Sequence, residues 1–249
     1  MIDVPLVRRV VVLETTGSTN DDARRLAQEG APEGTVVLAR SQTAGRGRLG
    51  RSWHSPEGSG LYLSILLRPE EPLDRIGRYS IVLALAALSA CRAAGAEAAR
   101  IKWPNDVLVE RRKVAGVLAE LRSGIGGAEL VAGFGINLGP PAGGYPAELA
   151  GRATSLADAS GRAPSFEQTA EGLLRALDHW VACLRGGGWD EVRDAFVRYA
   201  PSVQGANVTL RGGAAGTTRG LDDAGALLVA TASGLVSVHG GESLESWEA

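Results

Sequence analysis

The residues best suited to chemistry in this chain form a glycine- and arginine-rich stretch at positions 41–53. In chain order, its key residues are Gly45, Arg46, Gly47, Arg48, Gly50 and Arg51. The arginines are permanently charged, and their planar guanidinium groups match the geometry of phosphate oxygens. The glycines let the backbone bend and come close to a ligand. This combination favours a site for a polyphosphate, and a solvated basic loop is the simpler alternative.

The same stretch nearly matches two phosphate-binding motifs, but both fail on context. Its glycines fit the G-x-G-x-x-G string of dinucleotide-binding proteins, and residues 50–52 differ by one residue from the end of a P-loop. Both motifs need a helix directly after the glycines. Residues 53–60, W-H-S-P-E-G-S-G, cannot open a helix. The sequence therefore predicts that guanidinium groups and loop amides hold the phosphates, and not a helix N-terminus.

Polar residues also gather where a predicted strand gives way to a helix. The apolar run at 10–13 predicts a buried strand, and a helix should begin with Thr19 or Asn20 as its N-cap and stop at Gly30. A cap needs only one such side chain. The neighbouring polar residues Ser18, Thr19 and Asn20 therefore favour a binding site for a polar ligand such as an amide or ureido group.

A further candidate is Lys113, which heads the predicted strand 113–121. Strict alternation places Lys113 on one face with Ala115 and Val117, and Gly116 on the other face. A lysine at the start of a small-residue face is common in a pocket wall, although a solvent-exposed strand end is the simpler alternative. The predicted central strands contain Gly116, Gly133 and Gly135. Each costs about 0.5–1 kcal/mol, which is easiest to understand if something must approach the backbone there.

A sheet covered by helices is needed to bring these residues together. Apolar runs predict strands at 10–13, 35–39, 61–67, on either side of 103–106, and at 113–121 and 129–138. The strands from 100 onward form an antiparallel meander. Helical periodicity predicts helices at 20–30, 79–94, 165–185 and 189–200. Short β runs after residue 203 predict a small antiparallel barrel, so we expect an α/β (α+β) fold with domains 1–201 and 202–249.

Composition and charge exclude several classes of function. A net charge of −2 and a pI near 6.0 argue against a general nucleic-acid or membrane-surface binder. The apolar run at 81–94 is too short to span a bilayer, and no signal-peptide pattern opens the chain, so we expect a cytoplasmic protein.

The cysteines and histidines do not suggest catalytic or metal chemistry. Cys91 and Cys183 lie in apolar helical patterns, as buried thiols do. The three histidines are far apart, so neither a zinc site nor a Cys/His nucleophile is expected.

Taken together, the motifs resemble those of the biotin protein ligases, also called biotin–[acetyl-CoA-carboxylase] ligases. The motifs are G-S-T-N at 17–20, Q-T-A-G-R-G-R-L-G-R-S-W at 42–53, K-W-P-N-D at 102–106, R-K-V-A-G-V-L-A-E at 112–120, G-F-G-I-N-L at 133–138, and R-G-L-D-D-x-G-A-L-L with a terminal G-G-E. Each is weak alone, but six in this order are hard to obtain by chance. The resemblance covers nearly the whole chain.

The resemblance implies a mixed sheet with helices, related to class II aminoacyl-tRNA synthetases, followed by a small C-terminal SH3-like β-barrel. It implies an enzyme that uses ATP, with Mg²⁺, to convert biotin to biotinyl-5′-AMP. The enzyme would then transfer biotin to a lysine of a biotin carboxyl carrier protein of acetyl-CoA carboxylase or a related carboxylase. No enzyme residue has to form a covalent bond, because phosphoryl transfer depends mostly on positioning and charge stabilisation.

The resemblance also assigns roles to residues. Biotin would contact Ser18, Thr19, Asn20, Gln42, Gly45, Arg46, Gly47, Arg48, Trp53, Lys113 and Gly116. The nucleotide would contact Arg48, Arg51, Asn105, Asp106, Lys113 and Asn137. The catalytic groups would be Lys113, Arg46 and Arg48, and Asp106 would be a ligand of the metal. The 41–53 loop should be mobile without ligand and should close over biotinyl-AMP.

Three alternatives stay open at the level of sequence. A lipoate ligase or octanoyltransferase shares the fold family, but the latter needs a nucleophilic cysteine, and neither cysteine of this chain is placed for that. A DNA-binding biotin sensor would need an N-terminal helix-turn-helix, and the first motif begins at Gly17, which leaves no room for one. The last alternative is a plain nucleotide-binding protein. We expect no nucleic-acid or membrane partner, and a homodimer could form through the exposed edge of the meander.

Overall fold

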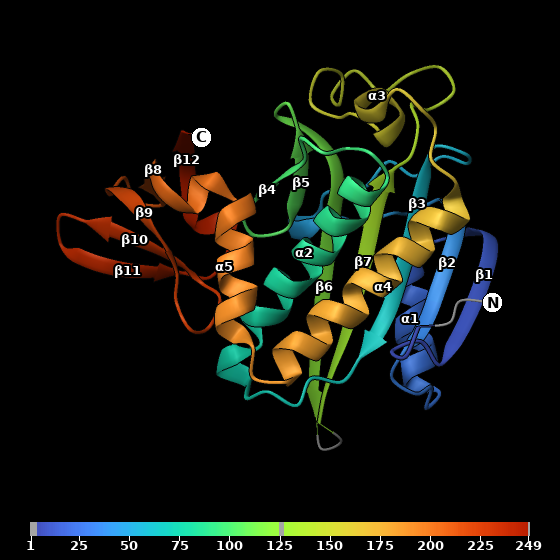
Figure 1. The fold of residues 1–249 in the computed structure, drawn as a ribbon, viewed down its shortest axis with the longest axis horizontal. Coiled ribbons are helices and arrows are strands. Elements are labelled where there is room, and N and C mark those ends of the chain that lie inside the picture. Colours follow the sequence, from blue (N-terminus) through green and yellow to red (C-terminus); the bar gives the residue numbers. More distant parts are fainter. Residues whose placement is uncertain (1–3, 125–126, 249) are drawn as a thin grey trace.

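A seven-stranded mixed sheet forms the body of the protein in a computed structural model that describes residues 4–124 and 127–248 (Figure 1). Its strands are β1 (Arg9–Thr16), β2 (Thr35–Gln42), β3 (Gly60–Leu67), β4 (Arg100–Lys102), β5 (Asp106–Val109), β6 (Arg112–Gly124) and β7 (Gly127–Asn137). Their order is β1-β2-β3-β7-β6-β5-β4. Only β1 and β2 are parallel, and the antiparallel pairing from β4 to β7 confirms the predicted meander.

Helices cover both faces of this sheet. They are α1 (Thr19–Gln28), α2 (Gly77–Ala93), α3 (Leu156–Ser160), α4 (Phe166–Arg185) and α5 (Trp189–Tyr199). In β2, Val37 packs with α1, whereas its neighbours Val36 and Leu38 join the large core beneath α2 and α4. Alternate strand residues point to opposite faces, so one buried strand supplies both cores. The α1 face carries the smaller core and, beside it, one part of the candidate site.

The N-termini of α4 and α1 can be compared with the helix caps predicted from the sequence. Ser165 caps α4 as a Ser-x-x-Gln sequence predicts, because its hydroxyl accepts the Gln168 backbone N–H at 3.3 Å. The predicted cap of α1 was wrong by one or two residues. Ser18 is the N-cap, and its side chain makes no capping hydrogen bond. The polar side chains at this helix start are therefore available for contacts outside the helix.

A β-bulge corrects the predicted face of Lys113. Consecutive residues of β5 pair with Lys113 and Ala115, so Val114 is an extra residue in β6. Val114 and Ala115 both enter the large core, and Lys113 turns to the opposite face. There its Cε lies 2.7 Å from the position that a Cβ on Gly116 would take. Strict alternation placed Lys113 and Gly116 on opposite faces, and the bulge brings them together.

The C-terminal part forms a separate antiparallel sheet, at the left of Figure 1. Its strands are β8 (Gln204–Leu210), β9 (Ala215–Leu221), β10 (Leu227–Thr231), β11 (Gly234–Val238) and β12 (Leu244–Glu248). The order β11-β10-β9-β8-β12 makes a curled half-barrel, in agreement with the predicted small β-barrel. It touches the helical layer at the β9–β10 turn, where Arg78 Nε donates to the Asp223 carbonyl at 2.5 Å.

The most apolar helix belongs to the core. By length and composition alone, residues 73–93 could cross a membrane. In the fold, Ile81, Leu85 and Leu88 of α2 are at most 1% exposed, since α2 is packed between the sheet and its neighbours α4 and α5. The apolar character of this helix is thus accounted for by packing inside the protein.

Candidate functional site

Two adjoining cavities lie where the 41–53 loop meets the sheet. The inner cavity, on the α1 face, measures about 50 Å³. Its lining consists of Ser18, Thr19, Asn20, Gln42, Arg46, Gly47, Arg48, Trp53, Asn105, Lys113, Gly116, Val117, Leu118, Gly133, Phe134 and Gly135. Arg46 and Arg48 of the loop thus line one cavity with Lys113, although they lie more than sixty positions from it in the chain.

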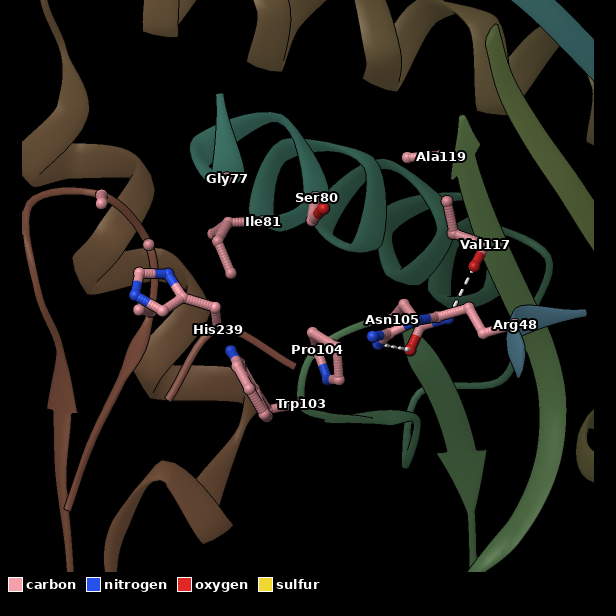
Figure 2. A pocket seen from close by; sticks show the side chains of 13 residues that line it. Arg48, Gly77, Ser80, Ile81, Trp103, Pro104, Asn105, Val117, Ala119 and His239 are labelled. Atoms are coloured by element: carbon pink, nitrogen blue, oxygen red, sulfur yellow. Dashed lines mark hydrogen bonds between the residues drawn. The ribbon is translucent and has the colours of Figure 1, made fainter. Parts of the chain in front are cut away.

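The outer cavity measures about 190 Å³ and lies between α2, the 103–105 turn, β6 and the C-terminal sheet (Figure 2). His239 and the β9–β10 turn reach it from the C-terminal side, and Ser80 and Ile81 from α2. The two cavities share Arg48, Asn105 and Val117. A long ligand could therefore extend from one cavity to the other.

Buried amides and hydroxyls form a hydrogen-bonded cluster at one end of the inner cavity. Gln42 Oε1 accepts the Thr19 backbone N–H at 2.9 Å, and Gln42 Nε2 donates to Ser55 Oγ at 3.0 Å. Ser64 Oγ lies 2.7 Å from Thr19 Oγ1 and 2.6 Å from Asn20 Oδ1. Thr19 and Asn20 are each 4% exposed and Ser64 is fully buried. The cluster, which we call the amide cluster, is fixed in place before any ligand contact is considered.

Asn20 has both ends of its amide engaged. Its Nδ2 donates to Glu120 Oε2 at 2.7 Å, while its Oδ1 faces Ser64. The amide lies directly on the backbone of β7, where a Cβ at Gly133 would collide with Asn20 Oδ1. Gly133 is therefore required by the close approach of a protein side chain to the strand.

Trp53 lies flat along the glycines at the middle of the inner cavity. A Cβ on Gly135 would collide with its indole, and one on Gly116 would lie 3.0 Å from it. Lys113 Nζ stands 5.0 Å from the centre of the indole ring, within cation–π range. The indole nitrogen is buried and has no hydrogen-bond partner among the residues that the structure describes. Trp53 and Lys113 together account for the small volume of this cavity.

The opposite end of the inner cavity carries charge, and we call it the cationic end. Lys113 Nζ pairs with Asp106 Oδ1 at 2.6 Å, with the two side chains 33% and 29% exposed. Arg48 Nη1 donates to Asn105 Oδ1 at 3.3 Å, at the junction of the two cavities (Figure 2). Asn105 is held in turn, because its Nδ2 donates to the Val117 carbonyl at 2.6 Å. These groups could bind an anion that spans the junction.

The 41–53 loop is folded back on itself. The Gly47 N–H donates to the Arg51 carbonyl at 2.7 Å, and the Trp53 N–H to the Gly45 carbonyl at 2.8 Å. A Cβ on Gly45 would lie 2.5 Å from Ser55 Oγ, so this glycine serves the crossing of the loop strands. These bonds hold the loop in a conformation in which Arg48 and Trp53 line the inner cavity.

Arg46 is tied to helix α1. Its Nη1 and Nη2 donate to the two carboxylate oxygens of Asp21 at 2.5 and 2.7 Å. This hydrogen bond is the main reason that the pKa of Asp21 lies below its ordinary value of 3.8, against the opposing effect of partial burial. Arg46 therefore sits at the amide-cluster side of the cavity, whereas Arg48 points to the cationic end.

Several expected ligand residues lie outside both cavities. Gly45 is buried within the loop crossing, and Arg51 is exposed. Asp106 contacts the site through its ion pair with Lys113. Asn137 directs its amide at the backbone, because Nδ2 donates to the Thr154 carbonyl at 2.9 Å and lies 3.4 Å from the Lys113 carbonyl. The contacts of the Asn137 side chain therefore stabilise the backbone at the start of β6.

Burial disfavours the thiolate form of both cysteines. Cys91 is fully buried in α2, and burial raises the pKa of its thiol to about 12. Cys183 lies on α4, and burial raises the pKa of its thiol as well. Within the described ranges 4–124 and 127–248, no three His, Cys, Asp or Glu side chains are grouped as a metal site would need.

Sequence reasoning missed some of the residues that build the site. Ser64, Glu120 and Asp21 position the amide cluster and the loop, and Phe134 and Leu118 line the inner cavity. Ser64 could have been noticed, since a serine interrupts the buried run L-Y-L-S-I-L-L. The others carry no local signal, because their partners come from distant parts of the chain.

Family models match both parts of the chain. Residues 12–137 match the model of the biotin/lipoate A/B protein ligase family, and residues 205–242 match that of the biotin protein ligase C-terminal domain. The chain is 38% identical over 225 residues to the biotin–[acetyl-CoA-carboxylase] ligase of Paracoccus denitrificans, covering 88% of this chain and 92% of that protein. It is 34% identical to the corresponding Mycobacterium tuberculosis ligase, covering 94% of this chain and 88% of that protein.

A solved structure supports the same relationship. The biotin protein ligase from Aquifex aeolicus in complex with biotin and ATP superposes with a TM-score of 0.80 at 29% identity, covering 97% of this chain and 99% of that one. The fold, the site and these matches define the class of the protein: the chain belongs to the biotin/lipoate A/B protein ligase family. Within that family it belongs with the biotin protein ligases, since its C-terminal sheet matches their C-terminal domain.

Proposed function

We propose that the inner cavity binds biotin, with its ureido ring at the amide cluster and its carboxylate at the cationic end. The protein then acts as an ATP-dependent ligase that forms biotinyl-5′-AMP and transfers biotin to a lysine of a carrier protein. The observation that carries this proposal is the joining of a neutral end, lined by hydroxyl and amide groups, and a cationic end in one cavity. Biotin has that same polarity, with a neutral ring at one end and an acid at the other.

The amide cluster supports biotin over lipoate. A ureido group offers two N–H donors and one carbonyl acceptor, which match the hydroxyl and amide groups of Ser18, Thr19 and Gln42 along the cavity wall. The dithiolane ring of lipoate has no N–H donors and no carbonyl acceptor, so it could not use the hydrogen-bonding capacity that those groups retain beyond their contacts within the cluster. Asn20 acts beside them as a fixed part of the wall, because its amide is already engaged.

The cationic end supports nucleotide activation. The biotin carboxylate attacks the α-phosphate of ATP, the bond to pyrophosphate breaks, and biotinyl-AMP forms. A carrier lysine amine then attacks the activated carbonyl and expels AMP. We assign Lys113 to the carboxylate and α-phosphate and Arg48 and Asn105 to the phosphates at the junction, where charge-assisted hydrogen bonds contribute about 1.5–3 kcal/mol each. The outer cavity offers room for the rest of the nucleotide.

The other predicted nucleotide contacts receive indirect roles. Asn137 positions Lys113 through the backbone of β6. Arg51 would reach the nucleotide only after a movement of the loop, so its assignment stays a prediction. A Mg²⁺ ion is ordinarily carried by phosphates with one or two protein carboxylates. Asp106 fits that need as the carboxylate beside the cavity, and the ion would supply neutralisation of phosphate charge.

Biotin entry requires the loop to move. A volume of about 50 Å³ falls far short of the roughly 300–1,000 Å³ of ordinary ligand pockets. Trp53 fills the space above the strand glycines. We propose that the loop swings away, admits biotin, and returns Trp53 onto the bound ring. Such closure also excludes water from the mixed anhydride, which hydrolyses easily.

The carrier, location and assembly follow as finer proposals. Family relationship supports a biotin carboxyl carrier protein of acetyl-CoA carboxylase or a related carboxylase as acceptor. We further propose that the protein acts in the cytoplasm and binds no nucleic acid. We propose 1–201 as the catalytic domain and 202–249 as the SH3-like domain, because α5 ends at Tyr199 and β8 begins at Gln204.

We propose that a homodimer would form through β1, the edge strand of the sheet on which Val10 and Val12 are exposed. The other edge strand, β4, lies beside α5. Light scattering of the purified chain tests the dimer.

Labelled-biotin transfer tests the function directly. The full chain is incubated with ATP, Mg²⁺, a carboxyl-carrier domain and either labelled biotin or labelled lipoate. We expect the biotin label, and not the lipoate label, to appear on the carrier in an ATP-dependent manner. Incorporation of lipoate in preference to biotin would refute the assignment. A gel-shift assay with DNA tests the proposed absence of nucleic-acid binding.

A further inference from the structure

Four charged side chains of alternating sign join the 41–53 loop to helix α1 and strand β6. Asp21 and Arg24 come from the first turns of α1, Arg46 from the loop, and Glu120 from β6. We call this set the latch network. Neither carboxylate is among the lining residues of the inner or the outer cavity, and the proposed chemistry does not use them. Their arrangement nevertheless ties the loop to the part of the site that holds the biotin ring.

The contacts of the network run in a closed circuit. Arg46 binds both carboxylate oxygens of Asp21, at 2.5 and 2.7 Å. Arg24 bridges Asp21 at 3.0 Å and Glu120 at 2.9 Å. Arg46 Nη2 also approaches Glu120 Oε2 at 3.8 Å. Charge therefore alternates around the circuit, and each carboxylate contacts both arginines.

The network is also connected to the amide cluster. The same Glu120 oxygen that pairs with Arg24 accepts the Asn20 amide at 2.7 Å. Asn20 in turn faces Ser64 within the cluster. A change in the position of Glu120 would thus be felt both by the loop arginine and by the wall of the biotin-ring end.

The energetics suit a releasable contact better than a permanent one. The side chains of Asp21 and Arg46 are 47% and 34% exposed, and isolated pairs with such exposure contribute little to stability. Bidentate arginine–carboxylate geometry within a network is the circumstance in which such pairs hold a defined position. Water and salt can compete for it, so the loop can open and close without a large barrier.

We propose that Asp21 and Glu120 are positioning residues that latch the 41–53 loop through Arg46, and that this latch sets how long biotinyl-AMP stays bound. Arg46 then serves as the loop's anchor at the biotin-ring end, while Arg48 serves the phosphates. The second half of the proposal rests on the proposed function, because it concerns retention of the adenylate. The first half concerns the loop alone.

Limited trypsin digestion of the full chain without ligand tests the loop half. Trypsin cleaves after arginine, and mass spectrometry identifies cuts after Arg46, Arg48 or Arg51. Asp21→Asn should raise the rate of loop cleavage at least threefold over wild type. Asp22→Asn is the matched control, because Asp22 lies in the same helical turn but contacts Arg25 and Thr16. Equal loop cleavage in wild type and Asp21→Asn overturns the latch.

Dissociation of preformed biotinyl-AMP from the same variants tests the retention half. Asp21→Asn should release it about fivefold faster at low salt, and the difference from wild type should shrink at high salt. A merely structural role would not give this salt dependence. Asp21→Asn combined with Arg46→Gln should add little to either change alone, because both remove one interaction. Additive effects of the two changes overturn the pairing.

Glu120→Gln provides a second variant should Asp21→Asn fold poorly. Glutamine keeps an acceptor for Asn20 but loses the charge that faces both arginines, so loop cleavage should again rise about threefold. Unchanged cleavage removes Glu120 from the latch. Failure of wild type to bind biotin, with loop protection still dependent on Asp21, overturns the proposed function and leaves the latch standing.

Discussion

The two ends of the inner cavity are built on different physical plans. At the amide cluster, Thr19, Asn20 and Ser64 are at most 4% exposed and hydrogen-bond one another. At the cationic end, Lys113 is 33% exposed and pairs with Asp106, and Arg48 contacts an asparagine across 3.3 Å. One end is neutral, buried and fixed. The other is charged, partly hydrated and open to rearrangement.

The difference matches two different tasks. A buried polar wall discriminates by shape and hydrogen bonding, because an unmatched group leaves a donor or acceptor unpaired. Partly exposed cations can rearrange around a substrate whose charge changes during the reaction. Their charges also cost less free energy than buried charges would, because they keep part of their hydration. We therefore expect substitutions at the cationic end to alter the rate of adenylation, and substitutions at the amide cluster to alter the affinity for biotin.

The largest expected effect is that of Lys113→Ala. Loss of its charge should slow biotin-dependent ATP–pyrophosphate exchange at least tenfold, in keeping with about 1.5–3 kcal/mol for a charge-assisted hydrogen bond. Lys102→Ala is the control, because Lys102 is the chain's other lysine and is exposed on β4. An unchanged exchange rate in Lys113→Ala would remove this lysine from the site and break the distinction between the two ends.

Gly133→Ala should weaken the affinity for biotin and leave the rate of adenylation nearly unchanged. Its Cβ would collide with the Asn20 amide, and overpacking of this kind costs about 1–3 kcal/mol. The Kd for biotin, measured by calorimetry, should rise about tenfold, with little change in exchange rate at saturating biotin. Gly172→Ala in α4 is the matched control, since a Cβ there meets nothing within 4 Å. Equal biotin affinity in Gly133→Ala and wild type would contradict the fixed wall.

Arg48→Ala should loosen retention of the adenylate more than it slows its formation. Arg48 lies at the junction of the cavities and contacts the site through Asn105, so we expect a three- to fivefold faster release of biotinyl-AMP. Single-turnover formation and chase experiments separate the two steps. Arg122→Ala, an exposed arginine at the far end of β6, serves as control. Release as slow as in wild type would show that Arg48 is dispensable for retention.

The smallest expected effect concerns pH and the latch. Hydrogen bonding to Arg46 lowers the pKa of Asp21 below 3.8, so the pair stabilises the folded state at pH values above the ordinary pKa. That contribution is lost as pH falls through the lowered pKa. Wild type should melt at most about 2–4 °C above Asp21→Asn at pH 7. The gap should hold to pH 5 and close below 3.8, and a gap that persists in stronger acid would contradict the pairing.

The sequence alone determined the elements of this protein and most of the residues in the cavity. Apolar periodicity located the meander and the helices α1, α2, α4 and α5, because burial of one face places an apolar residue at every second position of a strand and at every third or fourth position of a helix. The short helix α3 was not predicted. The polar run at Ser18 to Asn20, the glycine–arginine loop and Lys113 each stood out locally. These are properties of short segments, and short segments are what a single sequence reveals.

Only the tertiary structure decided how those segments meet. A bulge at Val114 turns Lys113 onto the face of Gly116, against strict alternation. The close neighbours of Gly133 and Gly135 are Asn20 and Trp53, which are protein side chains. Arg46 pairs with Asp21, twenty-five residues away, while Arg48 turns to the cationic end. The direction of a side chain depends on strand register and on partners from distant segments, and no local pattern encodes either.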